Sequence, residues 1–239
     1  MSQTNFIINA CSKQGSRRKN NQDCVSVNSW RSNQSVRDRF STKLSIDQLP
    51  AIFLLADGMG GHEKGEVASL TAIDTIFQHF SPEEEGFNLR SAVMEAHTAL
   101  SLSANSSHRP MGTTIVGLVL NTDEATVFNI GDSKIFKLNG NSIIQISHDD
   151  VGEWTPKNVI TQSLGGGSKS PKLNPCKFSY CPDDTFVLVC DGITDWLHND
   201  DIHKIVQLND EDSSDRLCSE AVRTGSGDDV SAVVIKCSN

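Results

Sequence analysis

The chain has 239 residues, of which 37% are hydrophobic, and this is enough apolar material to bury one sizeable core. Its formal net charge of −9 opposes binding to nucleic-acid backbones or anionic membrane surfaces, and Arg17, Arg18 and Lys19 are the single basic cluster in the sequence. We therefore expect one domain over residues 1–239, with no nucleic-acid or membrane partner. The sequence contains no run as long as a membrane span and Met1–Ala10 lacks a signal-peptide pattern, which predicts a cytoplasmic location.

Short strand-like runs dominate the chain. Most are rich in β-branched or aromatic residues and are bounded by Gly, Asp, Asn or Pro. The polar stretch Trp30–Pro50 is expected to be a surface insertion between strands. The predicted strands, in chain order, are Phe6–Cys11, Asp23–Asn28, Ala51–Ala56, Thr113–Leu120, Ala125–Ile130, Ile135–Leu138, Ser142–Ile146, Thr185–Cys190 and Val230–Cys237.

Two longer segments have apolar residues at three- and four-residue steps. This spacing predicts amphipathic helices over Glu63–Phe80 and Leu89–Leu102, and shorter helices are predicted over Asp200–Leu208 and Ser213–Val222. Helices that are grouped between runs of strands do not suit a regularly alternating parallel sheet. The predicted fold class is therefore α+β, with a sandwich of sheets covered by helices.

Carboxylates stand at the ends of several predicted strands. Glycine lets a backbone carbonyl approach a ligand, so an Asp-Gly pair at a strand end can offer two oxygen ligands together. Taken alone, an Asp-Gly pair is as well explained by a plain turn. The positions are Asp57 before Gly58, Asp191 before Gly192, Asp132 after Gly131, and Asp228 with Asp229 before the last strand.

Several carboxylates brought to one place repel one another, and this arrangement is costly without a cation. An acidic protein that handles phosphate also needs cations, because its own carboxylates repel the substrate. All-oxygen ligation suits Mg²⁺ or Mn²⁺, whereas zinc favours His and Cys. The repeated pattern therefore favours a shared metal site over a set of unrelated turns.

Six motifs, in order along nearly the whole chain, resemble the protein phosphatase 2C family in its bacterial form. They are Gly15-x-x-Arg18-x-x-Asn21-Gln22-Asp23, Asp57-Gly-Met-Gly-Gly61, Met111-Gly-Thr-Thr114, Gly131-Asp-Ser133, Asp191-Gly192 and Asp228-Asp-Val-Ser231. The resemblance implies two packed antiparallel β-sheets flanked by helices, in four layers. It also implies metal-dependent hydrolysis of phosphoserine and phosphothreonine in proteins, by a water that bridges the metals and without a phosphoenzyme.

The same resemblance assigns metal ligands residue by residue. Asp57 would bridge two divalent cations, Mn²⁺ or Mg²⁺, with the Gly58 carbonyl on one of them. Asp191 and Asp228 would bind the other. Asp132 matches the position that helps to bind a third, weaker cation.

Three further residues receive roles around these ligands. Asp23 would hold metal-bound waters, with help from Gln22. Arg18 would bind the substrate phosphate, for which the planar guanidinium is suited. Together with Asp57, these assignments make Arg18 and Asp23 the expected catalytic residues.

The sequence departs from the family pattern at several positions. Met59 stands where some members have a histidine that acts as general acid, which leaves His62 or a metal-bound water to protonate the leaving group. Val151–Lys157 is all that remains of a longer flap, so we expect a more open site with altered selectivity. The remaining departures are Lys134 in place of arginine, Asp150 in place of histidine and Asp229 in place of asparagine.

Two other functions compete with this hypothesis. Cys11 and Arg17 have the Cys-x5-Arg spacing of cysteine-dependent phosphatases, but Ala10 replaces the histidine expected before the loop, so we treat the match as coincidence. The alternative that stays open is a catalytically weak, phosphatase-like binding or sensory module. For an active enzyme, the expected partner is a phosphoprotein substrate, either a kinase or a kinase target.

Overall fold

The computed structural model describes residues 5–59, 64–80, 87–107, 111–152, 159–166, 169–208 and 212–238. The strands are β1 (Asn5–Lys13), β2 (Asp23–Val27), β3 (Trp30–Arg31), β4 (Arg37–Ser45), β5 (Ala51–Met59), β6 (Gly112–Thr113), β7 (Ile115–Leu120), β8 (Ala125–Ile130), β9 (Lys134–Asn139), β10 (Ser142–Gln145), β11 (Leu164–Gly165), β12 (Cys176–Phe178), β13 (Thr185–Val189) and β14 (Val230–Ser238). The helices are α1 (Gly65–Gln78), α2 (Leu89–Ser107), α3 (Asp191–Thr194), α4 (Asn199–Gln207) and α5 (Ser213–Thr224), with a 3₁₀ turn at Ile46–Gln48.

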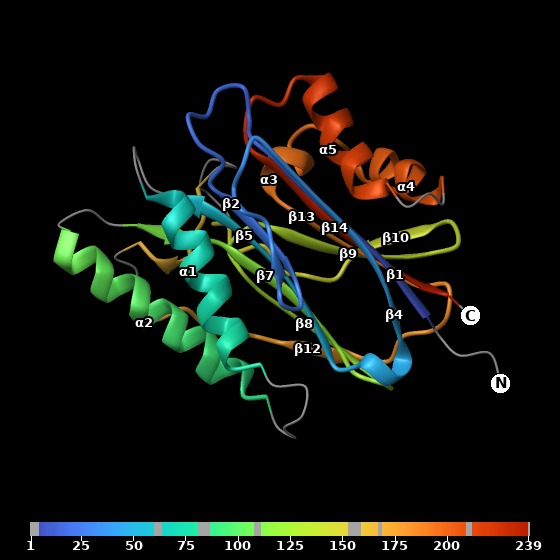
Figure 1. The fold of residues 1–239 in the computed structure, drawn as a ribbon, viewed down its shortest axis with the longest axis horizontal. Helices are drawn as coiled ribbons and strands as arrows, with labels where there is room; N and C mark the ends of the chain where they lie inside the picture. Colours follow the sequence, from blue (N-terminus) through green and yellow to red (C-terminus); the bar gives the residue numbers. More distant parts are fainter. Residues whose placement is uncertain are drawn as a thin grey trace.

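Within these ranges the strands form two sheets that pack face to face (Figure 1). One sheet has six strands in the order β10-β9-β13-β14-β1-β4. The other has eight strands: β11-β6-β5-β7-β8-β12, with β2 beside β5 and β3 beside β2. The main pairings are antiparallel, including β1 with β14 and β5 with β7. Phe53, Phe186 and Ile235 are among the residues buried between the sheets.

Helices cover the outer face of each sheet. Ile73 of α1 is buried with Leu54 and Phe128 of the eight-stranded sheet, while Leu217 of α5 is buried with Val234 of the six-stranded sheet. Because both faces of each sheet are covered, the central strands are apolar on both sides rather than alternating. The four-layer α+β fold predicted from the sequence is confirmed.

The prediction that Trp30–Pro50 is a surface insertion was wrong, because this stretch contains β4. All nine residues of β4 pair with β1, from Arg37 opposite Lys13 to Ser45 opposite Asn5. Phe40 packs against the core between the sheets. The strand lies at the edge of its sheet and its other face is exposed, so its polar composition resembles that of a loop.

Smaller differences concern the region around the predicted carboxylates. Asp191-Gly192 was predicted as a turn, but these residues begin the short helix α3. Most of the shortened flap and His62 lie outside the described residues. In the part of the chain that is described, no helix combines the length and hydropathy needed to cross a bilayer.

Candidate metal centre

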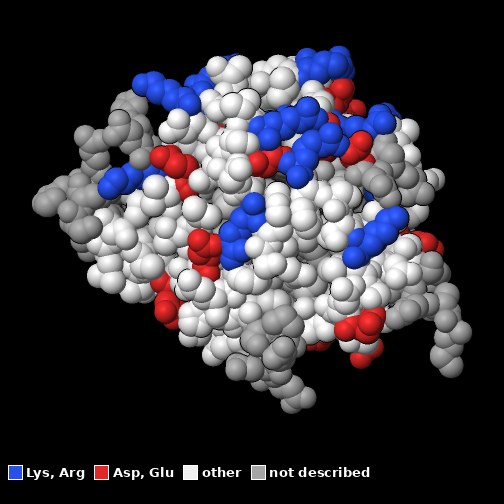
Figure 2. Space-filling model, viewed as in Figure 1, with Lys and Arg blue, Asp and Glu red and all other residues white. Residues whose placement is uncertain are grey.

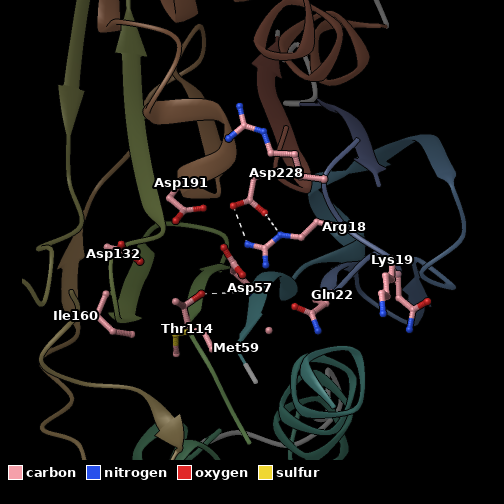
Figure 3. A pocket seen from close by; sticks show the side chains of 13 residues that line it. Arg18, Lys19, Gln22, Asp57, Met59, Thr114, Asp132, Ile160, Asp191 and Asp228 are labelled. Carbon is pink, nitrogen blue, oxygen red and sulfur yellow. Dashed lines mark hydrogen bonds and ion pairs between the residues drawn. The ribbon is translucent and has the colours of Figure 1, made fainter. Parts of the chain in front are cut away.

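An acidic cleft of about 640 Å³ opens where β5 ends and where α3 and β14 begin. We define this acidic cleft by the four aspartates that line it, Asp57, Asp132, Asp191 and Asp228. Figure 3 shows Asp57, Asp191 and Asp228 directed toward one another, with Asp132 to one side. The structure therefore brings together residues that lie far apart in the sequence. Gly58 and Gln22 line the same cleft.

Asp57 is held in place by its own strand and by the Thr113-Thr114 pair. Its backbone N–H donates to Thr114 Oγ1 at 3.0 Å, and its carbonyl accepts from the Thr114 N–H at 2.9 Å. Thr114 Oγ1 also hydrogen-bonds Ser133 Oγ at 2.8 Å, which links β5 to the turn that carries Asp132. The sequence motif Met111–Thr114 therefore fixes a backbone position rather than supplying a ligand.

Asp23 lies directly behind Asp57. The two residues face each other in the register of β2 and β5, and Asp23 is completely buried. Neither carboxylate oxygen of Asp23 has a hydrogen-bond partner; Ser231 and Cys190 lie near, but neither meets the geometry of a hydrogen bond. A buried carboxylate without donors is costly and is rare in folded proteins, so Asp23 points to a partner that the described residues do not supply.

Burial and crowding oppose ionisation throughout this group. Burial, followed by the charges of Asp23 and Asp191, raises the pKa of Asp57 well above its usual value. Burial and the charge of Asp229 do the same to the pKa of Asp23, and burial raises the pKa of Asp191. Burial and then the charge of Asp191 raise the pKa of Asp132 to about 6. A cation in the cleft would relieve these repulsions and favour the ionised forms.

Arg18 reaches into the cleft and binds Asp228 with two parallel hydrogen bonds. Its Nε lies 2.5 Å from Asp228 Oδ1 and its Nη2 lies 2.7 Å from Oδ2 (Figure 3). The Asp228 contact raises the pKa of Arg18. Among the described residues, no group of three acidic, His or Cys side chains already has the geometry to hold a metal ion. Arg18 therefore occupies carboxylate oxygens of Asp228 for which a cation at this position would compete.

Asp229 holds the loop that carries Arg18, a role that was not predicted from the sequence. Its side chain accepts hydrogen bonds from the backbone N–H groups of Gly15 and Gln22, each at 2.8 Å. These bonds close the loop that carries Arg18 over the acidic cleft. A Cβ at Gly15 would lie 2.2 Å from the Asp228 backbone, so the loop can approach only through glycine. The sequence shows that aspartate replaces the family's usual asparagine at position 229, but it does not show that this side chain bonds to Gly15 and Gln22.

A comparison with protein families agrees with this arrangement. The family model described as protein phosphatase 2C matches residues 28–231, which is most of the chain. The chain belongs to the protein phosphatase 2C family. The match begins after the loop that carries Arg18 and Gln22, so the cleft geometry is separate support for including that loop in the site.

Two relatives of this protein are protein phosphatases of bacteria. Serine/threonine protein phosphatase PstP of Mycobacterium tuberculosis is 29% identical over 206 residues, which cover 77% of this chain and 40% of PstP. The chain thus spans about two fifths of that relative's length. Protein phosphatase PhpP of Streptococcus pneumoniae is 27% identical over 212 residues, covering 77% of this chain and 85% of PhpP. The solved catalytic domain of PstP in complex with two manganese ions is 26% identical, with a TM-score of 0.77 and coverage of 98% of this chain and 100% of that one.

Proposed function

We propose that this chain hydrolyses phosphoserine and phosphothreonine esters in proteins and that divalent cations held by its aspartates are required. Membership of the family and the likeness to PstP and PhpP support protein dephosphorylation. The observation that carries the cation requirement is Asp23, which is buried behind Asp57 with both oxygens unpartnered. The ionised form of a carboxylate in this state needs positive charge from outside the protein, and without that charge its raised pKa favours the protonated form.

The proposed cations are two Mn²⁺ or Mg²⁺ ions, with a third, weaker one near Asp132. The donors in the acidic cleft are carboxylates and the backbone of Gly58, and this all-oxygen set fits hard divalent ions. The two manganese ions in the PstP catalytic domain support the same number. When bound, such cations supply the positive charge that activates a water for attack and neutralises the phosphate oxygens.

The proposed roles of the residues in the cleft are to hold the cations and to position the waters. Asp57 would bridge the ions, with the Gly58 carbonyl on one and with Asp191 and Asp228 on the other. Asp23, which is buried behind the acidic cleft, would accept hydrogen bonds from metal-bound waters through its two unpartnered oxygens, and so hold these waters in position. Gln22 lines the same cleft beside them.

Arg18 would orient the substrate. In this structure its planar fork holds both oxygens of Asp228, and the same fork matches two oxygens of a phosphate group. We propose that Arg18 transfers from Asp228 to the phosphate when cations take its place on the carboxylate. The guanidinium would then clamp the phosphate for in-line attack by the water.

The proposal extends to the setting of the enzyme. Residues 1–239 would act as one catalytic domain in the cytoplasm, with a phosphorylated kinase or kinase target as substrate. The matched region of PstP is less than half of that protein, so the choice of substrate rests on this proposal alone.

Phosphate release from a phosphothreonine peptide tests the proposed activity. Protein stripped with a chelator is expected to be inactive, to gain activity with Mn²⁺ or Mg²⁺, and to lose it again with excess chelator. Thiol alkylation is expected to have no effect, since Cys11 is buried in a strand. No release with either ion would contradict the proposal and favour the binding module; inactivation by alkylation would favour a cysteine-dependent enzyme.

A further inference from the structure

The outer edge of β4 is a long sheet edge that has no strand partner among the described residues. β4 is the last strand of the six-stranded sheet, and among the described residues β1 is its one strand partner (Figure 1). The strand is nine residues long, which exceeds the short edges that proteins normally leave open. An open edge of this length can accept a further strand from another chain.

The hydrogen-bond register tells which backbone groups face outward. The Gln14 N–H donates to the Val36 carbonyl at 3.0 Å, and the ladder continues with Lys13 opposite Arg37. In an antiparallel ladder, hydrogen-bonded and non-hydrogen-bonded pairs alternate. Position 36 is therefore bonded to β1, and the backbone groups of Arg37 point away from it.

The same alternation applies along the strand. The backbone N–H and C=O groups of Arg39 and Ser41 also point away from β1. An independent contact supports this parity, since the Ser45 N–H donates to the Gln48 side chain rather than to β1, at 2.9 Å. Arg37, Arg39 and Ser41 are exposed residues, so their outward backbone groups are accessible to a partner.

The exposed face of β4 is basic in a protein of net charge −9. Arg37, Arg39 and Lys43 lie on one face of β4, Arg37 contacts Asp215 of α5, and Lys13 of β1 lies opposite Arg37. Lys and Arg side chains gather over this region in the upper middle of Figure 2. This arrangement attracts an acidic partner strand.

The two arginines already contact carboxylates, but these contacts leave room for a partner. Arg37 Nη2 lies 2.5 Å from Asp215, and Arg39 Nη2 contacts Asp212. The arginine side chains stay 46% and 45% exposed, and exposed ion pairs of this kind are weak. A guanidinium has five N–H donors, so an incoming carboxylate can join or replace these contacts.

Pairing of β4 with β4 of a second copy is disfavoured by the same charges. An antiparallel pairing centred on Ser41 would set Arg39 opposite Lys43 of the other copy. Like charges that lie directly opposite in a sheet are destabilising. In this register, pairing of β4 with a second copy is therefore less favourable than pairing of β4 with an acidic strand.

We propose that β4 is a docking edge for an extended acidic segment of a partner protein, which adds to the six-stranded sheet as a further strand. Its backbone bonds to the outward groups of Arg37, Arg39 and Ser41, and its carboxylates at every second position meet the arginines. None of these residues is part of the lining of the acidic cleft, so docking and catalysis are separable.

Binding of a synthetic peptide to the full chain tests this proposal. The probe is a fluorescein-labelled peptide of alternating Glu and Val, and the control peptide has Gln in place of Glu. Fluorescence anisotropy is expected to detect binding of the acidic peptide that weakens with added salt. Arg37→Gln combined with Arg39→Gln is expected to lower the affinity about fivefold, from the loss of two cross-strand charge pairs.

Ser41→Pro isolates the contribution of the backbone. It removes one outward N–H, and proline is tolerated at an edge position whose N–H faces solvent. We expect the affinity for the acidic peptide to fall about fivefold, while Ser41→Ala keeps the N–H and binds like the wild type. Thermal unfolding verifies that both variants are folded.

Amide hydrogen exchange tests the docking of the peptide on the wild-type chain, without any substitution. The acidic peptide is expected to slow exchange at Arg39 and Ser41 and to leave Phe40 and Thr42, which already bond to β1, unchanged. Equal binding of the Gln peptide would overturn the proposal, as would identical affinities for Ser41→Pro and Ser41→Ala. Concentration-dependent dimers that Ser41→Pro abolishes would overturn it in favour of self-pairing.

Discussion

Two buried aspartates of this protein, Asp184 and Asp23, have opposite hydrogen-bonding environments. Asp184 is 1% exposed and accepts from Asn139 Nδ2 at 2.8 Å, from the Cys181 N–H at 2.7 Å and from Lys137 Nζ at 2.9 Å. Asp23 is equally buried, with 0% exposure, and has no hydrogen-bond partner for either oxygen. A carboxylate buried for stability is surrounded by its own donors. A carboxylate buried without donors points to a partner that the chain itself does not supply.

The largest expected effect is on catalysis. Asp57→Asn removes the bridging carboxylate of the acidic cleft and is expected to lower kcat on p-nitrophenyl phosphate by roughly a thousandfold or more, since metal-assisted charge stabilisation is worth several kcal/mol. Asp184→Asn is the matched control, because it removes a buried carboxylate outside the cleft and is expected to keep kcat. Equal losses in the two variants would erase the distinction between the two kinds of aspartate.

The second prediction concerns stability without cations. Asp184→Asn breaks a satisfied buried ion pair and is expected to lower the free energy of unfolding by about 2 to 3 kcal/mol. Asp23→Asn removes a carboxyl group that has no hydrogen-bond donor and whose pKa is raised by burial, which costs folding free energy at pH 7, so the cation-free variant is expected to be at least as stable as the wild type at this pH. Urea unfolding in the presence of a chelator compares them. A loss for Asp23→Asn as large as that for Asp184→Asn would mean that Asp23 is satisfied after all.

The third prediction concerns the competition between Arg18 and cations for Asp228. Arg18→Gln is expected to raise KM for a phosphopeptide about tenfold, through loss of charged hydrogen bonds to the phosphate. The same variant is expected to bind Mn²⁺ more tightly, because Asp228 loses its rival. Lys19→Gln is the control, since Lys19 lines the cleft and points away from Asp228 in Figure 3. Weaker Mn²⁺ binding by Arg18→Gln would contradict the competition.

The smallest expected effect is a pH dependence from Asp132. Burial and the charge of Asp191 raise its pKa to about 6 in the folded protein, above the value near 3.9 of an unfolded aspartate. Stability from the protonated form is present below the unfolded value and is lost as the pH rises through about 6. Relative to the cation-free wild type, Asp132→Asn is therefore expected to gain stability between pH 4 and pH 7. A difference that stays constant over this range would contradict the assignment.

Much of the site followed from the sequence because its residues stand at strand ends. Asp57 and Asp191 follow apolar runs that are typical of buried strands, and the order of the motifs indicated the family. The amphipathic pattern likewise located α1 and α2. These features depend on local sequence, which a single chain displays directly.

Other features depend on partners distant in the sequence. β4 alternates exposed polar residues with Phe40 and Leu44, and this weak apolar pattern of an edge strand does not distinguish it from a surface insertion. The two hydrogen bonds of Asp229 reach back to Gly15 and Gln22, more than 200 residues away. The pairing of Arg18 with Asp228 likewise depends on how the loop folds over the cleft. No pattern within one segment could reveal these contacts.

The most direct test of the central claim is the stoichiometry of Mn²⁺ binding to chelator-stripped protein, measured by isothermal titration calorimetry. The acidic cleft is expected to bind two ions in the wild type and in Asp184→Asn, and Asp57→Asn is expected to lose this binding. Wild-type protein that takes up no Mn²⁺, or an Asp57→Asn variant that binds it unchanged, would contradict the account.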